Sequence, residues 1–263
     1  MRPVEPKVRL VARPEVDWAS VKAYLDDVGG AAWLDRVLDD SDDGDGEALV
    51  EFGGRLCYRS WAPGLNANVT RVREDSAVYL DNVLASKHGS VLEHANYSFV
   101  FQDVSRVFTH ELVRHRAGAA YSQESMRFVR LTDLPFWFPK WVGEDSVLLD
   151  RCLTLLLTME EHQRWMAEHF GLDDPGVPFN EKKAKTSFMR RFAPDGVATA
   201  ILCTMNVRSL RWTIQARTDV HAEEEIRFVF DQVARLMLEE CPLLFGDFER
   251  NEDGQWVPRH AKV

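Results

Sequence analysis

Three short segments hold most of the residues in this sequence that could carry out chemistry. The first runs from Glu111 to Arg116 (ELVRHR) and the second from Ser122 to Arg127 (SQESMR). The planar guanidinium of arginine pairs bidentately with phosphate or carboxylate, so both segments are suited to anionic ligands. If a helix continues through Arg116, that side chain points about 200° away from the side chain of Arg114. The two arginines would then contact different ligands, and the alternative is a solvated, charged helix end.

The third segment follows Gly196 to Thr204, whose β-branched residues predict a strand. Here Asn206 precedes three arginines, namely Arg208, Arg211 and Arg217. Apolar residues between them predict a partly buried element: Val207, Leu210, Trp212 and Ile214. An unpaired arginine is costly in such a place. Either a polyanionic ligand satisfies these arginines, or internal ion pairs do, with Glu223, Glu224 or Glu225.

A group of histidines lies close to the first segment. His88, Glu93, His94, His110 and His115 fall within 28 positions, and such a cluster can hold a metal ion. His110 and Arg114 stand four residues apart, as do Glu111 and His115, which is the spacing of paired side chains on one helical face. We therefore expect local pairing and no metal site. The sequence also lacks GxxxxGK[ST], GxGxxG after a strand and HExxH, the common nucleotide and zinc motifs.

The elements that must position these residues alternate irregularly between helix and strand. Strands are predicted at residues 8–11, 97–101 and 196–204. Apolar spacing predicts helices from Trp18, over 69–83, over 104–112 after Asp103 or Ser105, over 152–170, over 180–192 after Asn180, and over 226–237. Helices outnumber strands, so we expect an α+β fold of mixed helices packed on a small antiparallel or mixed sheet.

Composition limits the class of protein further. The 263 residues are 45% apolar and 28% charged, which excludes wholesale disorder. The formal net charge of −10 argues against a nucleic-acid or acidic-membrane binder. No apolar run approaches the roughly 20 residues of a membrane span, and the polar start does not resemble a signal peptide. The four cysteines are scattered and are expected to be reduced, which predicts a cytoplasmic enzyme.

One low-complexity patch divides the chain. Asp39 to Glu47 is acidic, contains glycine and lacks apolar residues, so a mobile surface loop or linker is expected there. The predicted organisation is an N-terminal segment over 1–48, a single catalytic domain over 49–246 and a C-terminal tail over 247–263.

The order of these motifs resembles one enzyme family. RHRAGAAYSQESMR, with an RHR triplet and a later Ser-x-Arg, is similar to the signature of the flavin-dependent thymidylate synthases. HGSVLEH at 88–94, the segment from Arg190 to Pro194, Asn206-x-Arg208, and Arg217 with Asp219 and His221 resemble further elements of the family. Roughly residues 50 to 245 match in order. The linked motifs make the resemblance highly specific.

The resemblance implies a homotetramer with an α+β fold and with FAD held between subunits. It also implies dUMP, methylenetetrahydrofolate and NADPH as substrates. In that family the methylene carbon is transferred to uracil C5, and reduced FAD supplies the hydride that completes the methyl group. No nucleic acid or membrane is an expected partner.

Site residues follow from the resemblance by position. The implied FAD contacts are Ser90 (to a flavin of a neighbouring subunit), Arg114, His115, Arg116, Gln123, Asn206, Val207, Arg208, Arg211 and His221. The implied dUMP contacts are Glu111, Leu112, Val113, Arg114, Gln123, Glu124, Ser125, Met126, Arg127, Arg190 and Arg217. The resemblance makes Arg217 the catalytic residue, which activates the pyrimidine.

Three positions depart from the family pattern. Glu111 stands where some members have glutamine, and a carboxylate cannot donate to a carbonyl. Ala120 stands where serine is common, and Arg211 where some relatives have asparagine. Thymidylate synthases without flavin need an activated cysteine, typically beside proline and histidine, and no cysteine here has that context. Cys57 and Cys203 are expected to be small buried residues.

Two functions of other classes remain as alternatives. One is a nucleotide-sensing protein that kept the pocket and lost turnover, although Ser125, Arg127 and Arg217 are intact. The other is an RNA-binding module that uses the arginine clusters, which would show a steep salt dependence of affinity.

Overall fold

The computed structural model describes residues 1–39, 44–131 and 133–263. The chain divides into two compact units that interleave along the sequence. The first unit comprises residues 1–9, 100–114 and 121–203, and the second comprises 10–99, 115–120 and 204–263. Each unit is considered by itself below.

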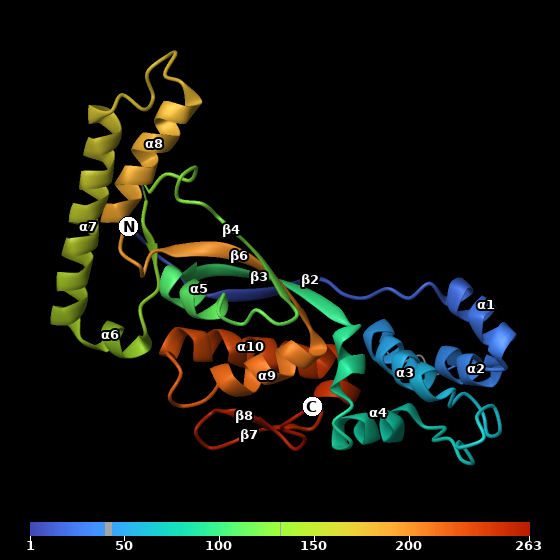
Figure 1. The fold of residues 1–263 in the computed structure, drawn as a ribbon. Coiled ribbons are helices and arrows are strands. Elements are labelled where there is room, and N and C mark those ends of the chain that lie inside the picture. The colour runs from blue at the N-terminus through green and yellow to red at the C-terminus, as the bar shows by residue number, and fades with distance from the viewer. Residues whose placement is uncertain (40–43, 132) are drawn as a thin grey trace. The chain divides into compact units, whose positions relative to one another are not determined.

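A four-stranded sheet has the order β2-β3-β6-β4. Its strands are β2 (Lys7–Ala12), β3 (Asn96–Ser105), β4 (Ala119–Gln123) and β6 (Ala198–Asn206). The alternating aromatic pattern of β3 buries Tyr97, Phe99 and Phe101, as its sequence predicts. Helices and small sheets occur together in the chain (Figure 1), so the predicted α+β class is confirmed.

The first unit contains two short helices and a helical pair. Its helices are α5 (Arg106–Leu112), α6 (Lys140–Glu144), α7 (Ser146–His169) and α8 (Phe179–Met189), with a 3-10 turn η2 (Arg190–Phe192). Strands β1 (Arg2–Pro3) and β5 (Pro135–Phe136) pair in parallel. α7 and α8 run side by side (Figure 1), where Gln163 Nε2 donates to the Met189 carbonyl at 3.0 Å. Met166, Leu172 and Met189 form the apolar contact of this pair.

The second unit holds the remaining helices of the described chain. They are α1 (Trp18–Val28), α2 (Ala31–Asp39), α3 (Asp45–Tyr58), α4 (Ser76–Ala85), the 3-10 turn η1 (Gly89–Glu93), α9 (Val207–Arg217), α10 (Glu224–Glu240) and α11 (Pro242–Phe245). Strands β7 (Phe248–Arg250) and β8 (Trp256–Pro258) form an antiparallel hairpin. Apolar faces of α9 and α10 are buried, including Leu210, Ile214, Val229 and Phe230. Trp33 and Trp61 anchor a separate aromatic cluster.

Most predicted elements are present, and three boundaries are corrected. The helix predicted over 69–83 begins only at Ser76, because the Asp75 side chain caps it by accepting from Val78 N at 2.8 Å. Asn180 is not an N-cap: α8 already starts at Phe179, after Pro178, whose fixed φ suits a helix entry. The strand predicted over 196–204 lies two residues later, as β6.

The acidic patch is only partly the loop that its composition predicts. Residues 40–43 lie outside the described residues, but α3 already begins at Asp45. The Asp45 carboxylate accepts from Val16 N at 2.7 Å, and Glu47 is buried and accepts from Leu243 N at 2.7 Å. These carboxylates therefore hold the second unit together. The boundary predicted between residues 48 and 49 falls inside α3.

Cys203 is buried as expected, whereas Cys57 is exposed near the end of α3. The expectation for Cys57 was wrong because the last turn of α3 is exposed, with Leu56 at 43% and Tyr58 at 57%. In the described part of the chain, no helix combines the length and the apolar character needed to cross a membrane.

Candidate active site

The RHR triplet lies after a helix and not within one. Helix α5 ends at Leu112, so the helical geometry considered for Arg114 and Arg116 does not arise. The helical spacing expected for His110 with Arg114 and for Glu111 with His115 therefore does not hold, because the helix ends before Arg114. Arg114 is the last residue of the 100–114 segment of the first unit and is exposed. Arg116 is exposed in the second unit.

In the second unit, the chain after the triplet is fastened to the start of α9. Asn206 caps this helix by accepting from Ser209 N at 2.8 Å, as asparagine commonly does. Asn206 N donates to the Gly118 carbonyl at 3.1 Å, and Ser209 Oγ donates to the Ala117 carbonyl at 2.5 Å. Gly118 has a φ of +62°, and a Cβ there would lie 2.0 Å from Asn206 Nδ2. Only glycine therefore fits this approach.

Arg208 connects α9 to the HGSVLEH segment of the same unit. Its Nη1 donates to Glu93 Oε1 at 2.6 Å, and its Nε donates to the Val263 carbonyl at 3.1 Å. A Cβ on Gly89 would lie 2.8 Å from Arg208 Nε, so the glycine makes room for the guanidinium. Ser90 is exposed next to it. The start of α9 and the HGSVLEH segment, both of which contain residues that the resemblance implies as FAD contacts, are therefore in contact.

Arg217, the last residue of α9, contacts the histidine of the triplet. Arg217 Nε donates to His115 Nε2 at 2.7 Å, and Thr213 Oγ1 lies 3.5 Å from His115 Nδ1. Burial, and after it the charge of Arg217, lower the pKa of His115 to about 4. The imidazole is therefore neutral near pH 7 and accepts a hydrogen bond from the cationic guanidinium.

Arg211 has a different environment on the same helix. Its side chain is 4% exposed and pairs with Asp247, with Nη1 2.6 Å from Oδ1 and Nη2 2.9 Å from Oδ2. The carbonyls of Leu244 and His260 accept further hydrogen bonds from it. The internal ion pair considered for these arginines is present here, although its partner is Asp247 and not a glutamate from 223 to 225.

His221 is exposed after α9, where its backbone N–H donates to Asp219 Oδ1 at 2.9 Å. Val207 is fully buried, so within this chain its backbone is the part that could meet a ligand.

The predicted dUMP residues, apart from Arg217, belong to the first unit. Gln123 Nε2 donates to Thr109 Oγ1 at 3.0 Å, which joins β4 to α5. The Glu124 carboxylate accepts from Ala200 N at 3.1 Å, so this side chain is held against β6. Leu112 is buried, and Val113 is exposed.

The turn that follows β4 presents Ser125 and Arg127. Ser125 Oγ accepts from Arg127 N at 3.3 Å, and Arg127 Nε donates to Ser187 Oγ at 3.0 Å. Thr186 Oγ1 donates to the Arg127 carbonyl at 2.8 Å, so α8 supports the turn. Met126 packs into the apolar cluster of Leu134.

Arg106 is a candidate that the motif comparison missed. Its Nη1 is buried without a hydrogen-bond partner among the described residues. Burial, and then the positive charge of Arg190, lower the pKa of Arg106, while Asp195 opposes this change. Backbone hydrogen bonds from Arg106 to Val197 and from Val107 to Asp195, both 3.2 Å, join the start of α5 to the chain after Arg190. Two guanidinium groups therefore share a region suited to an anion.

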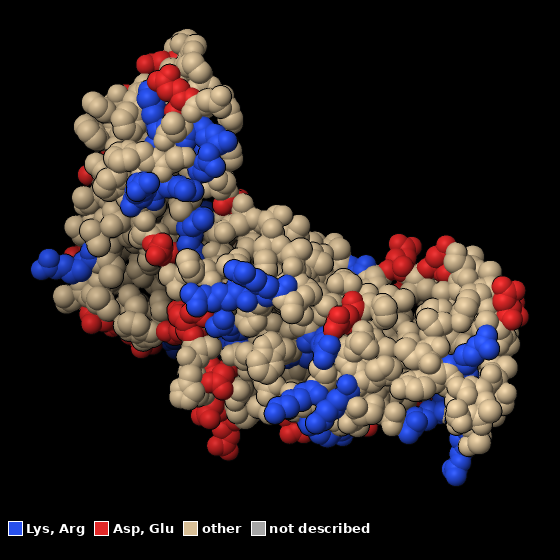
Figure 2. All heavy atoms as spheres, viewed as in Figure 1, with Lys and Arg blue, Asp and Glu red and all other residues tan. Residues whose placement is uncertain are grey.

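The cations of this unit are concentrated. Figure 2 shows Lys and Arg side chains gathered over α8, although acidic residues outnumber basic ones in the whole chain. The basic residues of α8 are Lys182, Lys183 and Lys185. Lys185 pairs with Glu181 at 2.6 Å.

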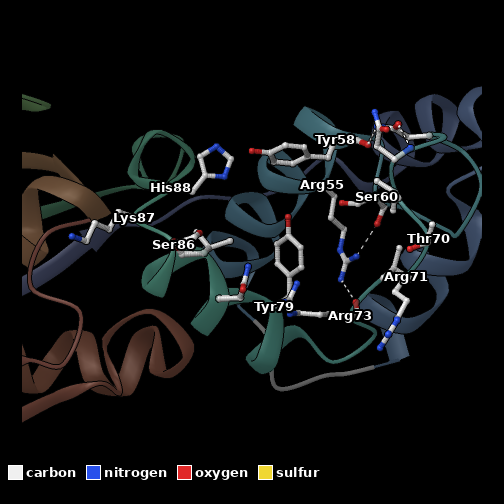
Figure 3. Close-up of a pocket in the computed structure, with 16 residues that line it drawn as sticks. Arg55, Tyr58, Ser60, Thr70, Arg71, Arg73, Tyr79, Ser86, Lys87 and His88 are labelled. Carbon is white, nitrogen blue, oxygen red and sulfur yellow. Dashed lines mark hydrogen bonds between the residues drawn. The ribbon is translucent and has the colours of Figure 1, made fainter.

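A cavity of about 820 Å³ lies in the second unit, between α3, α4 and the 60–73 loop (Figure 3). Cationic groups from Arg55, Arg71, Arg73 and Lys87 line it, and no Asp or Glu stands among the described residues of its wall. Tyr58 is 57% exposed, and its ring meets His88 edge-on with centroids 5.9 Å apart. A cavity of this size and charge suits an anionic ligand as large as a nucleotide.

Arg55 shapes this cavity. Its side chain is fully buried, pairs with Glu51 at 2.6 Å and lies over the Tyr79 ring at 4.2 Å. Its Nη1 donates to the Ser60 carbonyl at 2.9 Å and its Nη2 to the Arg73 carbonyl at 2.7 Å, which Figure 3 shows as dashed lines. One guanidinium thus holds both ends of the loop. The sequence offered only a weak signal for this role, an i, i+4 spacing from Glu51.

Comparison with known proteins agrees with the motifs. The model of the thymidylate synthase complementing protein family matches residues 36–243. A flavin-dependent thymidylate synthase of Mycolicibacterium vanbaalenii is 35% identical over 214 residues, covering 78% of this chain and 80% of that protein. The enzyme of that name from Mycobacterium tuberculosis is 35% identical over 208 residues, with the same coverage.

Among solved structures, the UMP/dUMP methylase PolB from Streptomyces cacaoi, bound with 5-Br dUMP, has a similar fold. The TM-score is 0.60 at 18% identity, and the match covers 94% of this chain and 96% of that one. The family match spans most of the chain and includes the RHR triplet and α9. The chain therefore belongs to the flavin-dependent thymidylate synthase family and is a methyltransferase enzyme.

Proposed function

We propose that this enzyme converts dUMP to dTMP by reductive methylation, with methylenetetrahydrofolate as carbon donor and NADPH as reductant. It works as a cytoplasmic homotetramer with FAD as its cofactor. Family membership supports the reaction class. The observation that carries the proposal for this chain is the contact of Arg217 Nε with His115 Nε2 at 2.7 Å, because it joins the implied activating arginine to the implied flavin-binding triplet.

Arg217 activates the pyrimidine. Uracil C5 is a poor nucleophile until negative charge builds on the ring, and in this chain the cysteines lack the context of an activated nucleophile. A guanidinium set against the N3–C=O edge stays charged and strengthens its hydrogen bonds as the oxyanion develops. Arg217 is suited to this task because its partner on Nε is an imidazole without charge.

Arg106 and Arg190 bind the phosphate of dUMP, supported by Arg127. A phosphate dianion accepts hydrogen bonds from several guanidinium groups, and the buried Nη1 of Arg106 then gains a partner. The ligand charge also removes the repulsion between Arg106 and Arg190. Gln123 and Glu124, both fixed by hydrogen bonds to the scaffold, complete the nucleotide contacts.

The residues of the second unit fit an anionic dinucleotide. The α9 start with Asn206 and Arg208, the exposed Ser90 and the cation-lined cavity beside His88 together offer hydrogen-bond donors to phosphate groups. When bound, FAD reduced by NADPH supplies the hydride that completes the methyl group. Arg211 is left out of the proposed flavin contacts because Asp247 occupies its guanidinium.

The experiment that tests the proposal compares Arg217→Ala and Arg217→Lys with the unchanged enzyme. Flavin content, melting temperature and single-turnover formation of dTMP are measured on one preparation. We expect the alanine variant to retain flavin and NADPH-dependent flavin reduction but to lose methyl transfer by about 10²–10³-fold. Lysine restores the charge without the planar fork and should recover part of the rate.

A stable, flavin-loaded Arg217→Ala enzyme with near-normal methyl transfer would refute the role of Arg217. If the unchanged protein binds dUMP and FAD but forms no dTMP with both co-substrates present, it is a nucleotide-sensing protein and the proposal fails.

A further inference from the structure

A chain of hydrogen bonds runs from the backbone of α9 to Arg217 at its end. Thr213 Oγ1 donates to the Ser209 carbonyl at 2.7 Å, and it lies 3.5 Å from His115 Nδ1. His115 Nε2 in turn accepts from Arg217 Nε at 2.7 Å. Thr213 is fully buried, so water does not compete for its hydroxyl. The contact between Thr213 and His115 is long for a hydrogen bond, and the other two are short.

The donors in this series of hydrogen bonds fix the tautomer of His115. Arginine has no acceptor, so Nε2 of His115 must present its lone pair to Arg217. The proton of the neutral ring therefore sits on Nδ1, facing Thr213. The Thr213 hydroxyl gives its own proton to Ser209, so its oxygen is left to accept from His115. All three contacts are consistent with one arrangement of protons.

The imidazole keeps this arrangement at neutral pH. Burial and the neighbouring guanidinium lower the pKa of His115 to about 4, so Nε2 has no proton to repel the arginine. An arginine side chain has several rotatable bonds, and holding its Nε at one acceptor restricts the directions that the guanidinium can take. The orientation of the planar fork then depends on the ring of His115.

We propose that His115 is a positioning residue for Arg217, accepting from its Nε so that the guanidinium plane is set toward the pyrimidine, and that Thr213 holds the imidazole in place. This inference rests on the proposed function, in which Arg217 activates dUMP. It assigns Thr213 a part in the reaction without contact to any substrate. A misplaced activating group slows the chemical step more than it weakens binding, so the loss is expected in kcat.

A double-mutant cycle tests the proposal. The substitutions are Thr213→Val, which keeps the shape and removes the hydroxyl, and Arg217→Lys, which keeps the charge and removes Nε. Thr213→Ser is the matched control because it retains the hydroxyl. In the unchanged background we expect Thr213→Val to lower kcat by about ten- to a hundredfold, with the KM for dUMP and the flavin content within twofold. Thr213→Ser should stay close to the parent enzyme.

In the Arg217→Lys background, Thr213→Val should have no further effect on kcat, because the Nε that His115 orients is no longer present. His115→Gln, measured on flavin-loaded protein, is expected to rescue more activity than His115→Leu, since the glutamine oxygen can accept from Nε. Equal losses from Thr213→Val in both backgrounds would overturn the positioning role while leaving Arg217 as the activating residue. Full activity of Arg217→Ala would instead overturn the proposed function.

Discussion

The middle and the end of helix α9 hold arginine in two different ways. In the middle, Arg211 is 4% exposed and faces a carboxylate, Asp247, that cancels its charge. At the end, Arg217 Nε faces the neutral ring of His115, which accepts a hydrogen bond without opposing the charge. Residues of the same type, six positions apart, therefore differ in what their partners do. The carboxylate makes Arg211 part of the scaffold, whereas the neutral ring accepts a hydrogen bond from Arg217 without adding a negative charge.

The largest expected effect is a loss of stability at Arg211. Arg211→Met leaves the Asp247 carboxylate buried without its cation, which costs about 3–5 kcal/mol of unfolding free energy. Burial works to raise the pKa of Asp247, but the hydrogen bonds and charge of Arg211 outweigh it and hold that pKa below its usual range. Chemical denaturation of Arg211→Met beside Arg217→Met measures the contrast. Equal destabilisation of the two variants would erase the distinction between the two parts of α9.

The sequence predicted a partly buried element at residues 207–217, but neither its helical form nor the role of each arginine. Apolar residues between the arginines indicated a partly buried element, and the family motif marked Asn206, Arg208 and Arg217. The pairing of Arg211 with Asp247 could not be read from either pattern, because the partner is 36 positions away in the chain. Its identity depends on how the β7–β8 hairpin folds back against α9.

The same limit applies to the first unit. The periodic apolar residues of α5 and α7 predicted those helices, and Ser105 was among the predicted N-caps. By contrast, nothing in the sequence distinguishes Arg106 from other basic residues at the start of a helix, because the residues that affect it are distant in the chain. Only tertiary structure brings Arg190 and Asp195 close enough to affect its pKa. The cavity of the second unit was likewise missed, because its walls come from α3, α4 and a loop whose helical spacing was misleading.

Arg106 extends the comparison to an arginine that faces another arginine. If it binds the dUMP phosphate, Arg106→Gln removes one charge-assisted hydrogen bond, worth about 1.5–3 kcal/mol. The KM for dUMP should then rise by roughly 10- to 150-fold. Steady-state kinetics with dUMP and with phosphate-free deoxyuridine measure the effect, and only the activity with dUMP should fall.

Arg130→Gln is the matched control for this charge change in the same unit. Arg130 is paired with Asp173 at 2.5 Å and plays no part in the proposed phosphate contact. If Arg106→Gln binds dUMP as tightly as Arg130→Gln does, Arg106 is a structural arginine like Arg211.

The smallest expected effect is a difference in how His115 and Asp247, the partners of the two α9 arginines, respond to acid. His115 has a folded pKa of about 4 against an ordinary value of 6.5, so above pH 6.5 the ring is neutral in both states and contributes nothing to the pH dependence. As the pH falls from 6.5 towards 4, the unfolded chain gains a proton that the folded chain does not, and stability decreases. Below about pH 4 both states are protonated and this decrease ends. The pKa of Asp247 is lowered from 3.8, so its contribution to stability is present above pH 3.8 and is lost only at more acidic pH.

Urea denaturation from pH 7 to pH 3.5 on the unchanged enzyme and on His115→Gln isolates the histidine, because the other titrating groups are shared. Between pH 6.5 and 4, the free energy of unfolding of the unchanged enzyme should fall more steeply than that of His115→Gln. Parallel curves across that range would mean that His115 titrates alike in both states, and the neutral partner assigned to Arg217 would be lost.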